Sequence, residues 1–174
     1  MSPHPPRTTT PPPEEGVPPG LPFVDEHRVR ITAGPVVVWA ALAGWLGERG
    51  GPAPAAYARL VRAQPASARP AGRSGGALAE GAALPGFRVA LSVPPERAVL
   101  TGRHLFSRYA AVLALSPEPG EEKGKGTGTV LAVRTYARFP GPLGAVYRAL
   151  VIGSGGHGVA VRRMLDSVRR RAEG

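Results

Sequence analysis

The sequence predicts an α+β fold, a single domain in which an antiparallel sheet packs against a long C-terminal helix. Between Phe87 and Phe139, apolar and polar residues alternate with the period of a strand, and short turn sequences interrupt them. Between Pro142 and Ala172, apolar residues recur every three or four positions, which is typical of an amphipathic helix. A chain of 174 residues is long enough to bury one core of ordinary size.

The N-terminal part divides into a tail and the start of the domain. Residues 1–22 are rich in proline and lack apolar periodicity, so we expect a disordered tail followed by one domain over residues 23–172. Residues 27–33 alternate like a half-buried strand. Gly34 and Pro35 end that strand, and the apolar stripe of residues 35–46 predicts a helix.

The next segment, residues 52–84, is of low complexity and rich in alanine, proline and glycine. It contains one short helical candidate, residues 55–63. Its composition fits a mobile cover of the domain or a surface insertion.

Period-two alternation then returns in four successive runs. They cover residues 87–93, 97–107, 109–115 and 129–139, and a glycine-rich loop, residues 116–128, separates the last two. Strands that follow one another through short turns pair as antiparallel neighbours. We therefore expect a meander.

The final helix contains a glycine-rich stretch, Gly153 to Gly158, that matches the Gly-x-Gly-x-x-Gly dinucleotide pattern. That pattern binds a dinucleotide only between two strands of a parallel sheet, and too few residues follow Gly158 here to supply the second strand. We therefore expect no nucleotide cofactor, and we expect the glycines to weaken or kink the helix.

Composition excludes several classes of protein. The chain has no cysteine, so disulfides, thiolate metal sites and cysteine nucleophiles are ruled out. The net charge of +10 comes mainly from scattered arginines and not from a basic patch interleaved with aromatics, so no specific nucleic-acid partner is expected. The chain shows no secretory signal and no apolar run of about 18 residues, which predicts a cytoplasmic protein without a membrane span.

Several segments resemble a known superfamily. Residues 29–42, Val-Arg-Ile-Thr-Ala-Gly-Pro-Val-Val-Val-Trp-Ala-Ala-Leu, resemble the first strand and helix of the START-like, polyketide-cyclase-like SRPBCC proteins, which share the helix-grip fold. Residues 84–89, 100–109 and 139–157 resemble a bacterial branch of that superfamily, and the resemblance covers about residues 24–172. It implies a deep apolar cavity between the sheet and the last helix, which would hold a small apolar molecule such as a lipid or a polyketide. The segment between the first helix and Phe87 departs from the pattern, so the resemblance does not say what covers the cavity.

Few polar side chains could act in such a cavity. His157 lies on the apolar stripe of the last helix, and His104 alternates in phase with Leu100 and Phe106, so both histidines are candidates to face inward. The favoured interpretation of each is a core histidine that bonds to a nearby backbone or hydroxyl group, and a pair that acts on a ligand is the alternative. The full set of candidate ligand-binding residues is His104, His157, Arg103, Tyr109, Tyr136 and Ser154. No carboxylate has the spacing of a metal site, so no metal is expected.

These features leave three hypotheses. The first is a protein that binds a small hydrophobic ligand without covalent chemistry. The second is an enzyme of the polyketide cyclase or aromatase kind, in which His104 or His157 moves protons. The third, which rests on charge alone, is a basic nucleic-acid-binding module.

Overall fold

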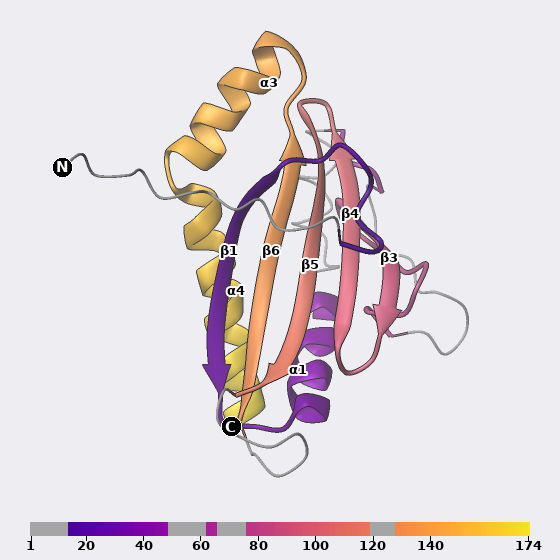
Figure 1. The fold of residues 1–174 in the computed structure, drawn as a ribbon, viewed down its shortest axis with the longest axis vertical. Coiled ribbons are helices and arrows are strands. Elements are labelled where there is room, and N and C mark those ends of the chain that lie inside the picture. The colour runs from indigo at the N-terminus through magenta and orange to yellow at the C-terminus, as the bar shows by residue number, and fades with distance from the viewer. Residues whose placement is uncertain (1–13, 49–61, 66–75, 119–127) are drawn as a thin grey trace, which may run out of the picture.

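The fold of the computed structural model is a six-stranded antiparallel sheet that curves around two helices (Figure 1). The structure describes residues 14–48, 62–65, 76–118 and 128–174. The predicted α+β class is confirmed, and the curved sheet with a helical C-terminal segment on one face is a helix-grip arrangement. Within the described residues, no helix is both long and apolar enough to cross a membrane.

The strands run in the order β1-β6-β5-β4-β3-β2, so the predicted meander forms the centre of the sheet. Each pair of neighbours is antiparallel. Their bounds are β1 Phe23–Ile31, β2 Ala83–Leu84, β3 Phe87–Val93, β4 Arg97–His104, β5 Ser107–Pro117 and β6 Thr129–Arg138.

Strand β1 begins four residues before the predicted start at His27, and it pairs with β6, the last strand of the chain. Local alternation predicted the second half of the strand, where Val29 and Ile31 pack into the core. The first half carries Asp25 and His27 at core-facing positions, and polar residues there hide the alternation that marks a strand.

Strand β3 does not keep one face throughout, although the period-two alternation of residues 87–93 implied that Phe87, Val89, Leu91 and Val93 share a face. The register with β4 shifts between Val89 and Leu91. Val89 therefore joins the main core, whereas Leu91 packs on the opposite face of the sheet. This β-bulge corrects the prediction, because one extra residue reverses the side on which every later side chain lies.

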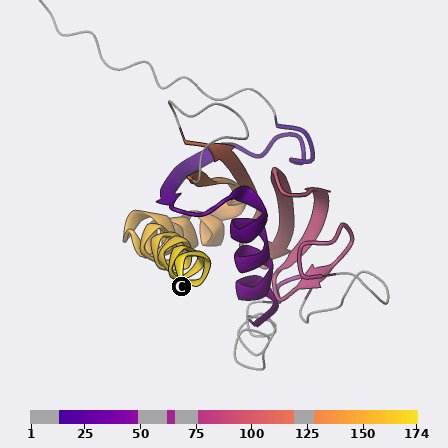
Figure 2. The ribbon, with the colours of Figure 1, turned by 90° about the horizontal axis from the view of Figure 1, so that it is seen from below.

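Helices α1, Pro35–Glu48, and α4, Gly156–Glu173, cover one face of the sheet, which we call the helix face. Figure 2 shows them side by side inside the curve of the sheet. Val38 and Leu42 of α1 and Leu165 and Val168 of α4 are buried against it in the main core. The apolar stripes predicted from spacing are the buried stripes of both helices.

The C-terminal helical segment is broken, so the prediction of one continuous helix was wrong. It consists of α3, Gly141–Arg148, a π-helical turn η1, Ala149–Gly153, and α4. Between η1 and α4, Gly155 has a φ of 77°, a left-handed conformation that ends a helix and that glycine adopts at low cost. The glycines were predicted to weaken or kink the helix, and the break lies among them.

The face of the sheet away from the helices, which we call the outer face, is covered in part by residues 14–22. Val17 and Leu21 pack on a second apolar cluster around Val112 and Tyr136. The tail was predicted to extend to residue 22, but the structure adds residues 14–22 to the packed domain. Residues 1–13 lie outside the described residues.

The low-complexity segment, residues 52–84, is described only in part. Its helical candidate, residues 55–63, lies almost wholly outside the described residues. Its last part packs into the domain, because Leu78 and Leu84 are buried in the main core and β2 pairs with β3.

Candidate functional site

A cavity of about 390 Å³ lies between the helix face of the sheet and the C-terminal helical segment. Its walls come from strands β3 to β6, from α1 and from the segment that runs from α3 to α4. Most of the wall is apolar, with Trp45, Leu100, Leu113, Val133, Val161 and Met164 among its residues. A few polar side chains interrupt it: His104, Ser107, Tyr109, Thr135, Tyr147 and His157. Both histidines predicted to face inward therefore line this one cavity.

His104 stands at the end of β4, and both of its ring nitrogens are engaged. Nδ1 accepts a hydrogen bond from the backbone N–H of Phe106 over 3.1 Å, and Nε2 lies 3.0 Å from the hydroxyl of Ser107. Because Nδ1 accepts, the ring proton of the neutral form is on Nε2 and is donated to Ser107. Burial lowers the pKa of His104, which agrees with a neutral ring. His104 is thus a half-buried histidine whose two ring nitrogens both have hydrogen-bond partners.

Aromatic rings close this end of the cavity. Tyr147 of α3 packs edge-on against His104 with ring centroids 4.7 Å apart, and it stacks on Phe106 at 5.3 Å. Phe139, at the end of β6, lies 6.3 Å from the same tyrosine ring. The short helix α3 is therefore held to the β4–β5 turn by Tyr147, and this contact sets where the cavity ends.

His157, in the first turn of α4, belongs to a separate polar cluster. Its Nε2 lies 3.1 Å from the hydroxyl of Thr135 and 3.5 Å from Oδ1 of Asp25. The other carboxylate oxygen of Asp25 lies 3.3 Å from Nε2 of His27. One carboxylate thus stands between two imidazoles, and its Oδ1 is buried with no hydrogen-bond partner. A buried carboxylate oxygen without a partner favours a hydrogen-bond donor at Nε2 of His157.

The His27 ring of β1 lies against Gly158 in the first turns of α4. A Cβ on Gly158 would lie 3.4 Å from both Cε1 and Nε2 of the His27 ring. Gly158, one of the glycines that match the nucleotide pattern, therefore lies where α4 contacts β1. The packing of α4 against β1 places His157 next to Asp25, which is far away in the sequence.

Tyr109 lies in β5 directly opposite Gly102 of β4. Its hydroxyl donates to the carbonyl of Gly86 over 2.7 Å, and its ring packs edge-on against Phe87 at 5.1 Å. A Cβ on Gly102 would lie 2.0 Å from the carbonyl oxygen of Gly86 and 2.6 Å from Cε2 of Tyr109. The ring fills the space that the missing side chain leaves, so Tyr109 is first a packing residue of the cavity wall.

The remaining predicted residues lie elsewhere. Arg103 points from the outer face, where its Nε donates to Oε1 of Gln64 over 2.7 Å. Tyr136 is also on the outer face, where its hydroxyl donates to Glu14. Ser154 is exposed in the helix break, where its hydroxyl donates to the Leu150 carbonyl and accepts from the Gly156 N–H. The structure therefore brings together His104, His157 and Tyr109 at the cavity, but not the other three.

Sequence reasoning missed Asp25, Thr135 and Tyr147. Asp25 could have been found by extending the alternation of Val29 and Ile31 backwards, because residues 25 and 27 continue the same face of β1. Thr135 lies in phase with the buried positions of β6. Nothing in the sequence indicated that Tyr147 would reach the β4–β5 turn. Within the ranges that the structure describes, no group of three or more His, Cys, Asp or Glu side chains is arranged so that it could hold a metal ion.

Comparisons with known proteins give solved structures with a similar fold. No family model matches the chain, and no curated protein matches it. A solved structure of a conserved protein from Geobacillus kaustophilus is similar at 15% identity with a TM-score of 0.50, over 84% of this chain and 93% of that one. A Rhizobium loti protein gives 16% identity and a TM-score of 0.46 over 84% and 94% of the two chains. Ara h 8.0201 gives 13% identity and a TM-score of 0.41 over 85% and 95%. At these identities the likeness concerns the fold.

Proposed function

We propose that this protein binds a small, mostly apolar ligand in the cavity between the sheet and the C-terminal helical segment. The cavity itself carries this proposal, because about 390 Å³ of space with a mostly apolar wall lies next to the main core. Ligand sites commonly have volumes of about 300–1,000 Å³ and a few placed polar groups.

The polar side chains of the cavity wall indicate which chemical groups the ligand has. At one end His104 is already bonded through both nitrogens, so it offers the ligand an aromatic surface. At the other end His157 and Thr135 lie together on the wall. The proposed ligand therefore has a long apolar part and, at the α4 end, one group that exchanges a hydrogen bond with His157 or Thr135. A lipid or polyketide fits this description.

The sequence resemblance to START-like SRPBCC proteins agrees with this proposal. The resembling segments, residues 84–89, 100–109 and 139–157, include five of the cavity's six polar side chains: His104, Ser107, Tyr109, Tyr147 and His157. Membership of that superfamily is part of the proposal.

One observation favours a second candidate, an enzyme of the cyclase or aromatase kind. The Asp25 carboxylate 3.5 Å from Nε2 of His157 could stabilise a protonated imidazole, which a proton-transfer step would need. His104 is unsuited to that role, because burial lowers its pKa and its Nδ1 accepts a backbone hydrogen bond. If chemistry takes place here, His157 is the residue that performs it.

The first experiment is native mass spectrometry of the protein purified from its own host, compared with the denatured mass. A retained apolar compound supports the proposal. Incubation of that compound with the wild type and with His157→Ala then separates the candidates. Conversion that the variant loses indicates an enzyme, and unchanged ligand in both indicates a binding protein.

A matched pair of variants tests the place of binding. Ala111 faces the cavity from β5, whereas Ala114 lies on the same strand at the opposite parity and does not line it. Ala111→Phe is expected to fill the cavity and to reduce binding of an apolar fluorescent dye by about tenfold or more, and Ala114→Phe is expected to leave it nearly unchanged. Equal binding by Ala111→Phe and the wild type, with both folded by circular dichroism, would refute the cavity as the site.

A further inference from the structure

Three arginines stand in a row across the outer face of the sheet. Arg103 of β4 lies directly opposite Arg108 of β5, and Arg108 lies directly opposite Arg138 of β6. All three side chains are exposed. Like charges directly opposite one another in an antiparallel sheet destabilise it, so this row lowers the stability of the free protein.

Other arginines of the outer face form ion pairs with carboxylates. Arg134 pairs with both Glu14 and Glu26, Arg97 pairs with Glu15, and Arg30 pairs with Glu118. In contrast, Arg108 and Arg138 make no ion pair with any residue that the structure describes, and neither does Arg88 on β3. Among the described residues, the carboxylates of this face thus pair with other arginines and not with Arg108 or Arg138.

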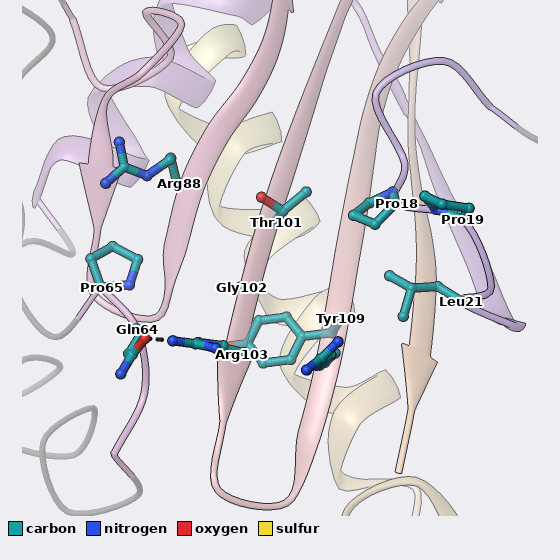
Figure 3. Close-up of a pocket in the computed structure, with 11 residues that line it drawn as sticks. Pro18, Pro19, Leu21, Gln64, Pro65, Arg88, Thr101, Gly102, Arg103 and Tyr109 are labelled. Atoms are coloured by element: carbon teal, nitrogen blue, oxygen red, sulfur yellow. Dashed lines mark hydrogen bonds between the residues drawn. The ribbon is translucent and has the colours of Figure 1, made fainter. Parts of the chain in front are cut away.

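Two members of the row, Arg103 and Arg108, line a groove of about 680 Å³, which Figure 3 shows in close-up. Arg88, Arg103 and Arg108 line it, Pro18 and Pro19 form one wall, and Pro65 forms another. No acidic residue is among the groove's lining in the described part of the chain. Gln64 holds the Arg103 guanidinium through a 2.7 Å hydrogen bond, so one of the three cations has a fixed position before any ligand arrives.

We propose that this groove is a second binding site, which takes a small molecule carrying two or more phosphate groups. A guanidinium presents parallel N–H donors that match two oxygens of a phosphate, and it stays charged at every physiological pH. Neighbouring strands are about 4.8 Å apart, so the row from Arg103 to Arg138 extends about 10 Å at the backbone. A chain of linked phosphates can contact several members of the row, whereas one phosphate spans only part of it.

This site is independent of the ligand cavity. It lies on the outer face of the sheet, whereas the cavity lies on the helix face, and among the described lining residues only Tyr109 borders both. The polyphosphate site can therefore be tested whether or not an apolar ligand is present.

The experiment is isothermal titration calorimetry of the full chain with inorganic tripolyphosphate, at about 0.15 M ionic strength so that loose attraction to a basic protein is screened. Arg108→Gln removes the central charge of the row. Arg163→Gln is the control, because Arg163 is an exposed arginine of α4 that forms no ion pair with a described residue, and its loss changes the net charge equally. Single-stranded DNA is titrated in parallel.

We expect tripolyphosphate to bind the wild type, Arg108→Gln to bind it about tenfold more weakly or worse, and Arg163→Gln to match the wild type. We also expect Arg108→Gln to melt at a higher temperature than the wild type without anion, because it relieves repulsion in the row. No binding by the wild type, or an equal loss in both variants, would overturn the proposal. DNA binding without tripolyphosphate binding would overturn it in favour of a nucleic-acid surface.

Discussion

The hydroxyl of Tyr136 and the guanidinium of Arg134 both donate to one oxygen of Glu14, over 3.1 Å and 2.7 Å. Tyr136 is 4% exposed, so this pairing lies under the segment of residues 14–22 that crosses the outer face. Glu14 therefore fixes the N-terminal segment to the centre of β6. The segment closes one wall of the polyphosphate groove through Pro18 and Pro19.

Glu14→Gln is expected to lower the free energy of unfolding by about 1–3 kcal/mol, because Arg134 and Tyr136 lose a charged acceptor. Glu15→Gln is the matched control, since the Glu15 side chain is 77% exposed and its ion pair with Arg97 should contribute less than about 1 kcal/mol. Chemical denaturation of both variants measures the difference. Equal losses would show that the segment is not fixed through Glu14.

We expect the contact between Tyr136 and Glu14 to make the fold less stable at high pH. Burial, the hydrogen bond to Glu14 and the negative charge of Glu14 raise the pKa of Tyr136 to about 12. A group whose pKa is raised by folding stabilises the fold below its unfolded value, near 10, and that stabilisation disappears as the pH rises from about 10 to 12. Absorbance titration should show Tyr136 ionising late, and Tyr136→Phe should remove that late step. A late step that persists in the variant would assign it to another tyrosine.

We expect the ion pairs of Glu26 to make the fold less stable at low pH. Burial acts to raise its pKa, but hydrogen bonds from Arg28 and Arg134 and the charges of both arginines outweigh burial and lower it. A carboxylate with a lowered pKa stabilises the fold above its unfolded value, near 4.5, and loses this effect as the pH falls through the folded pKa. The stability of Glu26→Gln should therefore change less than that of the wild type below about pH 5. Parallel acid-denaturation curves would contradict this.

Gly102→Ala tests the close approach of Tyr109. The added methyl would lie 2.0 Å from the carbonyl oxygen of Gly86, which is backbone and cannot rotate away. We expect the free energy of unfolding to fall by about 2–3 kcal/mol. Gly153→Ala is the control, because a Cβ there meets nothing within 4 Å and alanine favours a helix. The control should be neutral or stabilising in the same denaturation experiment, and a similar loss in both variants would rule out the contact as the cause.

His104 should titrate below its ordinary value of 6.5, because burial lowers its pKa. The unfolded chain then binds more protons than the folded one as the pH falls below 6.5, so the fold loses stability in that window and regains it as the pH rises. An NMR titration of the ring protons, assigned with His104→Phe, measures the midpoint. A midpoint at or above 6.5 would mean that the ring is accessible to a proton and would restore His104 as an acid-base candidate.

Three of the predicted candidates line the cavity. Two of them, His104 and His157, were predicted to face inward because both sit in phase with apolar residues, which is a local property of the sequence. What each histidine does there depends on partners that local periodicity does not show. Ser107 is three residues from His104 and could have been anticipated. Asp25 is far from His157 along the chain, and only the approach of β1 to α4 brings them to 3.5 Å.

The sequence by itself determined the elements whose contacts are local: the meander from β3 to β6, the start of α1 at Pro35, and the apolar stripes of α1 and α4. Alternation and turn residues act between chain neighbours, so their pattern is visible without the fold. Only the tertiary structure decided the pairing of β1 with β6, the bulge after Val89, the break at Gly155 and the packing of residues 14–22. It also aligned Arg103, Arg108 and Arg138, because which side chains stand opposite one another depends on strand register, and a shift of one residue reverses every face.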